Sequence, residues 1–250
     1  MKKLVALLAL TMWASAAFAA GSGANLVSAK VDLSDQASLQ RGAQLFVNYC
    51  LSCHSATYMR YNRVGLDLGL NDQQVKDNLL FVGDKVGATM ETAMSDEDAK
   101  VWFGVAPPDL SVISRSRGAD WLYSYLLAFY EDESRPFGVN NLVFPQVGMP
   151  HVLASLQGIQ VLKPEKPHAE GEHEVHSSAP FTTKLELKTA GVLSAGEFRV
   201  AMRDLTNFLV YVGEPAKLDR YRLGLWVMAF LVVFFFLSRA LYKEYWKDVH

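Results

Sequence analysis

The two cysteines of this 250-residue chain lie in one short segment, Cys50-Leu-Ser-Cys53-His54, in which an imidazole directly follows the second thiol. In an exported protein such a pair could serve as a structural disulfide, as a redox-active dithiol, or as the attachment site of haem c, whose spacing is Cys-x-x-Cys-His. In the third case the thiols form thioethers with the porphyrin, and the histidine becomes the proximal iron ligand. A zinc site is excluded because the chain has no second cysteine pair to complete it.

The residues that precede Cys50 favour haem over a redox-active dithiol. A dithiol site of the thioredoxin type would follow a strand in a βαβ unit. The segment 38–49 instead has the pattern of a helix, with one face formed by Leu39, Gly42, Phe46 and Tyr49. We therefore predict one covalently attached haem c, held by Cys50 and Cys53, with His54 as an iron ligand.

A haem c that carries electrons needs a sixth ligand, and methionine is the usual one, which raises the reduction potential. Among the eight methionines, Met149 lies in a loop whose shape is set by Gly148 and Pro150, far along the chain from His54. The others fall in the N-terminal leader, in helical or membrane segments, or too close to His54. We predict that Met149 ligates the iron. His151 is the alternative ligand, and is otherwise expected at the surface or beside a haem propionate.

The pair Pro107-Pro108 has a chemical use of its own. Two prolines fix an extended strip that has no amide donors at these positions, while its carbonyls remain free to accept. A proximal histidine normally donates its second ring N–H to such an acceptor, which fixes its tautomer. We hypothesise that the carbonyl of Pro107 or Pro108 accepts from His54; the alternative is a plain turn.

These residues must be positioned by an exported, mainly α-helical domain. The start of the chain has Lys2 and Lys3, a short apolar run and the small-x-small sequence Ala17-Phe18-Ala19, which indicate a signal peptide over residues 1–19. An uncleaved anchor helix is the alternative. The segment 197–212 has apolar residues at helical spacing, and Gly42 would let the helix before Cys50 cross it closely. Such a helix pair is the frame of a class I cytochrome c fold.

The other end of the chain predicts a transmembrane helix over residues 223–242. Twenty helical residues span about 30 Å, the thickness of the hydrocarbon core. Its only charge, Arg239, lies near one end, where the side chain can reach the headgroups. With an exported N-terminus, residues 20–222 form a periplasmic domain and residues 243–250 a cytoplasmic tail of an inner-membrane protein. The bases Lys217, Arg220 and Arg222 on the exported side run against the usual charge distribution. A buried helix of a soluble core is the alternative.

The charge balance excludes nucleic acid as a partner. The formal net charge is −2, and without Lys2, Lys3 and the tail after Ser238, with its three bases and two acids, it is about −5. Acids gather at 95–98 and 131–133, either as solvated faces and helix starts or as a docking surface for a basic partner. Residues 163–180 are rich in Pro, Glu and His and indicate a flexible insertion.

Taken together, these motifs resemble the cytochrome c1 family of the ubiquinol–cytochrome c reductase (cytochrome bc1) complex. The resemblance covers nearly the whole mature chain. It rests on CLSCHS, on GVAPPDLSVISRSRG at residues 104–118, on the following Asp120-Trp121-Leu122-Tyr123, on the methionine loop, on the late helix and on a single C-terminal anchor. The VGMPH form of the methionine loop is similar to that of bacterial members.

The resemblance implies a subunit that works beside cytochrome b. It would take electrons from the Rieske iron–sulfur subunit and pass them through one haem c to a cytochrome c. It also implies that Arg117 pairs with a haem propionate. Such a subunit is an electron carrier without an independent catalytic site. The alternatives are a membrane-anchored cytochrome c that serves a terminal oxidase or another dehydrogenase, a haem enzyme or gas sensor with no methionine on the iron, and a thiol–disulfide oxidoreductase.

Overall fold

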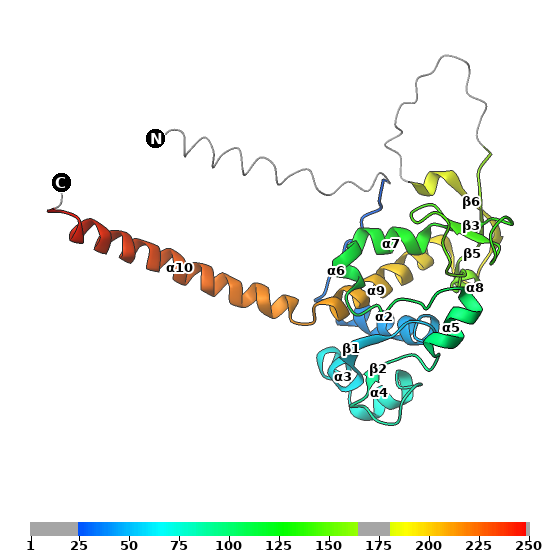
Figure 1. Cartoon of the computed structure of the whole chain (residues 1–250), viewed down its shortest axis with the longest axis horizontal. Coiled ribbons are helices and arrows are strands. Elements are labelled where there is room, and N and C mark those ends of the chain that lie inside the picture. The colour runs from blue at the N-terminus through cyan, green and yellow to red at the C-terminus, as the bar shows by residue number, and fades with distance from the viewer. Residues whose placement is uncertain (1–24, 165–180, 249–250) are drawn as a thin grey trace, which may run out of the picture.

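The computed structural model describes residues 25–164 and 181–248, so the predicted signal peptide and most of the 163–180 insertion lie outside the described residues. Helices dominate the described part, as the sequence predicts, and the strands are short (Figure 1). In chain order the elements are α2 (Gln36–Tyr49), β1 (Ala56–Arg60), α3 (Tyr61–Leu68), α4 (Asp72–Asn78), β2 (Thr89–Met90), α5 (Asp96–Phe103), α6 (Ile113–Arg117), α7 (Ala119–Leu127), β3 (Phe129–Glu131), β4 (Val139–Asn141), α8 (Ala154–Gln157), β5 (Gly158–Leu162), the 3₁₀ helix η2 (Phe181–Lys184), β6 (Leu185–Ala190), α9 (Ala195–Gly213) and α10 (Lys217–Tyr245).

The crossing of α2 and α9 forms the centre of the core. The Asp35 side chain caps the start of α2, and Ser194 with Glu197 forms a capping box at the start of α9. The helices meet at Gly42, where an added Cβ would lie 2.1 Å from the carbonyl oxygen of Asp204. Only glycine allows this approach, because the space that a side chain would need is filled by the backbone of the other helix.

A buried polar network fixes the register of this crossing. Asp204 is 3% exposed and accepts from Ser38 Oγ at 2.6 Å and from Arg41 Nε at 2.6 Å. Asn207 donates to Ser38 Oγ at 2.7 Å. A buried carboxylate is tolerated only when it is paired and hydrogen-bonded, so sliding α2 along α9 would leave this charge without partners.

Helix α7 is held from two sides. It packs against α9, and the segment before α2 is hydrogen-bonded to it. The Ala29 amide donates to Asp120 Oδ1 at 2.7 Å, and the Val27 amide donates to Ser124 Oγ at 2.8 Å. Three antiparallel strand pairs, β1–β2, β3–β4 and β5–β6, shape the connections around this helical core.

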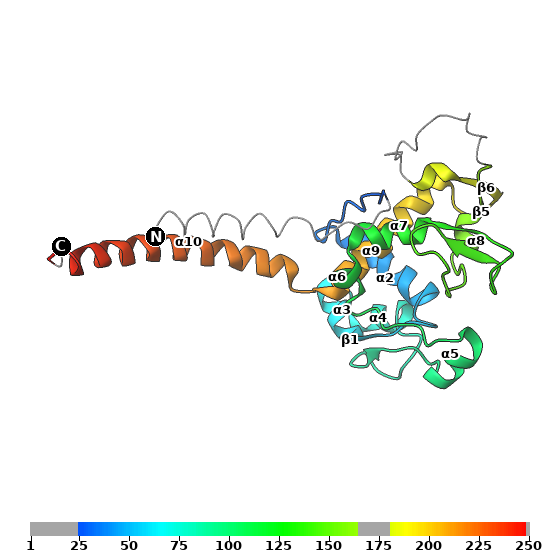
Figure 2. The same ribbon diagram turned by 45° about the horizontal axis from the view of Figure 1, so that its top comes forward.

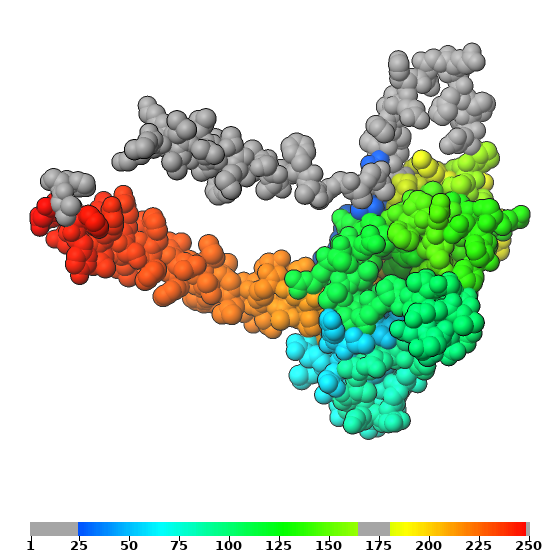
Figure 3. Space-filling model, viewed as in Figure 1, coloured from blue at the N-terminus to red at the C-terminus, as the bar shows by residue number. Residues whose placement is uncertain are grey.

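Helix α10 leaves the globular part and stands clear of it (Figures 1 and 3). It contains the apolar segment 223–242 and starts and ends a few residues beyond it. Its mean hydropathy is 2.1 over the most apolar window, and none of that window is buried. An exposed apolar surface of this length is unfavourable in water, so α10 is a membrane helix.

Candidate haem-binding site

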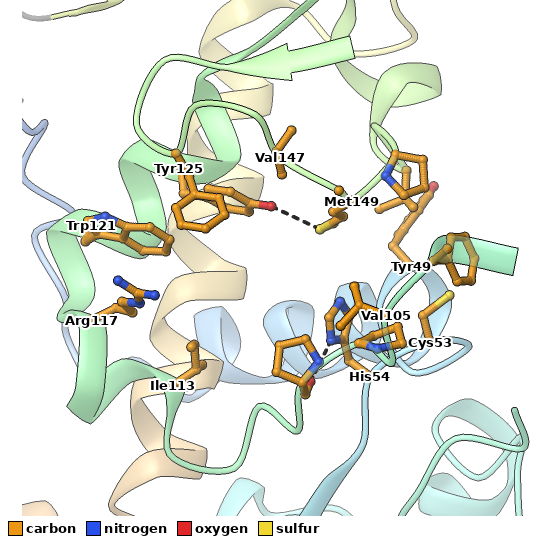
Figure 4. Close-up of a pocket in the computed structure, with 17 residues that line it drawn as sticks. Tyr49, Cys53, His54, Val105, Ile113, Arg117, Trp121, Tyr125, Val147 and Met149 are labelled. Atoms are coloured by element: carbon orange, nitrogen blue, oxygen red, sulfur yellow. Dashed lines mark hydrogen bonds between the residues drawn. The ribbon is translucent and has the colours of Figure 1, made fainter. Parts of the chain in front are cut away.

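An apolar cavity of about 330 Å³ opens where the ends of α2 and α5, the helices α6 and α7, and three loops meet (Figure 4). Of the residues predicted for the site, only Cys50 does not line it. The predicted residues in its wall are Cys53, His54, Pro107, Pro108, Arg117 and Met149. They come from segments far apart in the sequence, so the cavity exists only in the folded chain.

The cysteines and the histidine occupy the turn that ends α2. Cys50 is the C-cap residue, and its carbonyl accepts from the amides of Cys53 at 3.0 Å and His54 at 2.8 Å. Both thiols are free. Cys50 lies beside the core, and burial raises the pKa of its thiol to about 12, with a smaller contribution from Cys53. Cys53 and His54 face the cavity, so this turn places a thiol and an imidazole at the same wall (Figure 4).

The His54 ring has a fixed orientation. Its Nδ1 lies 2.7 Å from the carbonyl oxygen of Pro108, and because a carbonyl can only accept, Nδ1 carries the hydrogen. Nε2 is then the nitrogen with a free lone pair, as a metal ligand requires. Burial lowers the pKa of His54, and the hydrogen bond to Pro108 opposes this only in part, which favours the neutral ring. Between the two prolines, the geometry selects Pro108.

The strip that carries Pro108 is anchored just after it. Asp109 Oδ2 accepts from the amide and the hydroxyl of Thr57, both at 2.9 Å, and its Oδ1 accepts from the Ser111 amide at 2.7 Å. Burial alone would raise the pKa of Asp109, but these hydrogen bonds outweigh it and lower the pKa. The Leu110 amide donates to the carbonyl of Ser55 at 2.8 Å. The acceptor for His54 is therefore part of a rigid connection to the residues that follow His54.

Met149 lies on the loop across the cavity from His54 (Figure 4). The Tyr125 hydroxyl donates to Met149 Sδ at 3.3 Å. At the base of the loop, Gln146 has a φ of 62° and its amide donates to Asn140 Oδ1 at 2.8 Å. Arg135 donates to the Gln146 carbonyl at 3.0 Å. The loop is thus shaped by the β3–β4 hairpin, and one thioether points into the cavity.

The alternative ligand, His151, is placed differently. It does not line the cavity, and its ring stacks on Phe129 with centroids 4.8 Å apart. The residue is partly exposed, but both of its ring nitrogens are buried. Burial lowers its pKa to about 4. His151 therefore packs the methionine loop against Phe129, on the side away from the cavity.

A ladder of flat side chains follows one face of α6 and α7. The Arg117 guanidinium lies 5.0 Å from the Trp121 ring centroid and 5.8 Å from that of Phe144. Trp121 stacks on Tyr125 with centroids 5.1 Å apart and an angle of 9°. Arg117 forms no salt bridge with any described residue. It therefore offers a cation to an anionic group bound at the edge of the cavity.

Two residues of this ladder, Trp121 and Tyr125, were missed as site residues by the sequence analysis. A signal for them was present, because Arg117, Trp121 and Tyr125 follow one another at i, i+4 and i+8. That spacing places them on one face of a helix but does not say what the face covers. The hydrogen-bond partner of Tyr125 is Met149, which belongs to the loop after the β3–β4 hairpin.

The donor set fits a haem c and does not fit a metal ion held by protein ligands alone. The cavity is apolar, with the Cys53 thiol and the His54 imidazole at one wall and the Met149 thioether at the other, and the second free thiol, Cys50, lies in the same turn as Cys53. No group of three His, Cys, Asp or Glu residues that could hold a metal ion occurs among residues 25–164 and 181–248. A flat apolar macrocycle with an iron that takes one nitrogen and one sulfur ligand matches this arrangement.

The chain has clear relatives among known proteins. Residues 28–157 match the Cytochrome C1 family. The chain is 49% identical to cytochrome c1 of Allochromatium vinosum over 250 residues, which is all of both proteins. It is 44% identical over 244 residues to a protein named ammonia monooxygenase gamma subunit from Nitrosomonas europaea, covering 98% of this chain and 97% of that protein. It is 27% identical to cytochrome c1 of Rhodospirillum rubrum over 235 residues, covering 86% of this chain and 83% of that protein. The chain therefore belongs to the cytochrome c1 family, whose members transfer electrons within the cytochrome bc1 complex.

Proposed function

We propose that this protein is the haem c subunit of a respiratory quinol–cytochrome c reductase. It accepts an electron from the Rieske iron–sulfur subunit, beside cytochrome b, and passes it to a cytochrome c. The observation that carries the proposal is that His54 and Met149 face one apolar cavity from opposite walls (Figure 4). Two occupied axial positions suit electron transfer, because no coordination site remains for oxygen or peroxide.

Each site residue has a separate role in this proposal. Cys50 and Cys53 would hold the haem by two thioether bonds, and His54 and Met149 would ligate its iron. The bound haem supplies one-electron chemistry. Pro108 keeps His54 in one tautomer, and Pro107 adds to the apolar wall beside it. Arg117, already oriented by Trp121 and Phe144, pairs with a propionate.

The membrane arrangement follows from the ends of the chain. We infer a cleaved leader at 1–19, a periplasmic domain at 20–222, a membrane segment at 223–242 and a cytoplasmic tail at 243–250. The exposed α10 supports a single anchor, and the leader supports the orientation. Anchoring would keep the haem domain at a short, fixed range from the other subunits.

The test of the ligand pair replaces Met149 with leucine in the haem-loaded protein. We expect the weak far-red absorption band of methionine–iron(III) ligation to disappear, while haem staining on a denaturing gel remains because both thioethers persist. Met59→Leu is the matched control, since Met59 is 2% exposed in the core and does not line the cavity. A far-red band that survives in Met149→Leu would reject Met149 as the ligand.

A second candidate function has one specific observation in its favour. The relative with 44% identity bears the name of a monooxygenase subunit, which suggests a haem c subunit that serves another oxidoreductase. Purification from native membranes separates the two. Recovery together with a cytochrome b and a Rieske protein supports the reductase, whereas recovery with an oxygenase or a terminal oxidase, without these two, supports the alternative.

A further inference from the structure

Helices α3 and α6 lie at the end of the globular part from which α10 leaves (Figures 1 and 2). The Tyr211 hydroxyl, in the last turns of α9, donates to Asp67 Oδ2 at 2.8 Å, and Arg63 forms a salt bridge with the same carboxylate. On α6, Ser114 packs against Gly213, where an added Cβ would lie 2.3 Å from Ser114 Oγ. One face of each helix is therefore next to the base of α10.

This end of the molecule is rich in positive charge. We define the basal collar as Arg63, Arg115, Lys217, Arg220 and Arg222. Three acids, Asp67, Glu214 and Asp219, lie near these five bases in the sequence. The collar is therefore positive, whereas the exported part as a whole has a net charge of about −5. The acidic first turn of α5 lies on the opposite side of the globular part (Figures 1 and 2). The collar and this acidic turn therefore lie on different sides of the globular part.

Several collar cations are close together and still available. The pKa of Glu214 is lowered, first by its hydrogen bond from Arg220 and further by the charges of Arg115 and Lys217. Within the described residues, Arg115, Lys217 and Arg222 form no salt bridge. Their charges are therefore not neutralised by a salt bridge within the described residues, and none of the three lines the haem cavity.

The height of the collar matches that of lipid headgroups. The apolar part of α10 begins at Leu223, and the helix rises about 9 Å from Lys217 to that residue. The headgroup region on one side of a bilayer is about 6 Å thick. If residues 223–242 span the hydrocarbon core, as proposed above, then Arg220 and Arg222 start about 5 and 2 Å outside it, within the headgroup region. Lys217 starts just beyond that region, and its long side chain can reach back to the phosphates. Leu66, on α3 between Arg63 and Asp67, is 77% exposed, and such an apolar side chain beside charged ones suits the membrane interface.

We propose that the basal collar binds the anionic headgroups of the leaflet that α10 enters, so that the haem domain rests on the lipid surface through α3 and α6. This proposal rests on the membrane anchoring given under the proposed function. It explains why three bases precede the membrane segment on the side where positive charge is usually sparse. Resting on the lipid would limit the swing of the domain about the short connection between α9 and α10.

Hydrogen–deuterium exchange of the full, haem-loaded chain in vesicles tests the proposal. The vesicles contain either phosphatidylcholine alone or phosphatidylcholine with phosphatidylglycerol. We expect amides in α3 and α6 to exchange several-fold more slowly only when phosphatidylglycerol is present. Molar salt should remove this protection because the screening length falls to about 3 Å. Equal exchange in both kinds of vesicle would overturn the proposal without any variant.

A triple variant, Arg115→Gln with Lys217→Gln and Arg222→Gln, removes the three unpaired collar charges. A base near an anionic surface favours binding about fivefold, so we expect the three changes together to abolish the protection. The matched control, Lys100→Gln with Lys184→Gln and Arg199→Gln, removes three exposed charges elsewhere and should keep it. An unchanged haem spectrum shows that each variant has folded.

Three further outcomes separate lipid binding by the collar from a protein interface and from a failure of the anchoring. Protection that requires a purified complex with its partner subunits, and that does not depend on phosphatidylglycerol, would assign the collar to a protein interface and overturn lipid binding. A chain that fails to float with vesicles of either composition would overturn the anchoring itself, and the collar proposal with it. A chain that floats but shows no lipid-dependent protection overturns the collar proposal alone.

Discussion

The hydrogen bond from Tyr125 to Met149 predicts a measurable control of the haem potential. In Tyr125→Phe the ring and its stacking on Trp121 remain, and only the hydroxyl, 3.3 Å from the sulfur, is removed. A donor on the sulfur withdraws electron density from the iron, which disfavours the ferric form. Its loss should therefore lower the midpoint potential.

The size of the shift follows from the strength of this contact. A hydrogen bond contributes about 1 kcal/mol net, and if all of it distinguished the two oxidation states the shift would be about 40 mV for one electron. We expect a decrease of this order or smaller in an equilibrium redox titration of the haem-loaded protein. The variant keeps Met149 and its sulfur, so we expect the far-red methionine band to remain.

Tyr123 provides the control on the same helix. Its hydroxyl donates to the Arg199 carbonyl, also at 3.3 Å, but it does not line the cavity. Tyr123→Phe should reduce the free energy of unfolding by about 1 kcal/mol and leave the potential unchanged. An unchanged potential in Tyr125→Phe, or an equal shift in Tyr123→Phe, would refute the assignment of Tyr125 to the methionine sulfur.

Three other predictions follow from the fold and the site. Arg117→Leu removes a cation beside the cavity and should lower the midpoint potential in a redox titration, whereas Arg115→Leu on the outer surface should not; equal shifts would remove Arg117 from the site. Gly42→Ala places a methyl group in the backbone of α9 and should reduce the free energy of unfolding by about 3 kcal/mol in denaturant titrations. Gly196→Ala, where an added Cβ meets nothing within 4 Å, should not be destabilising, and similar losses in both would contradict the close crossing. The folded-state pKa of Asp109 is lowered, so its contribution to stability is present above the unfolded-state pKa and is lost as pH falls through the folded-state pKa. Asp109→Asn should therefore lose less stability than the parent protein between neutral and acidic pH, and identical acid profiles would contradict this.

Patterns that are local in the chain were sufficient to predict much of this protein. The helical face of Leu39, Gly42 and Phe46 is buried as expected, because helical periodicity alone determines which residues share a face. The same holds for the late helix, which forms α9. The length and apolar composition of residues 223–242 predicted α10, since hydrocarbon thickness sets the length of a membrane helix. The Cys50-x-x-Cys53-His54 spacing pointed to haem c because the chemistry itself fixes that spacing.

The tertiary structure decided which distant residues meet at the cavity. The sequence left Pro107 and Pro108 equivalent as acceptors, and only the folded strip brings the Pro108 carbonyl to within 2.7 Å of His54. The spacing of Arg117, Trp121 and Tyr125 is visible in the sequence, but the sulfur that accepts from Tyr125 belongs to a loop shaped by the β3–β4 hairpin. The sequence also could not assemble the basal collar, whose members come from α3, α6 and α10. Periodicity and spacing describe neighbours along one element, whereas contacts between elements depend on how the whole core packs.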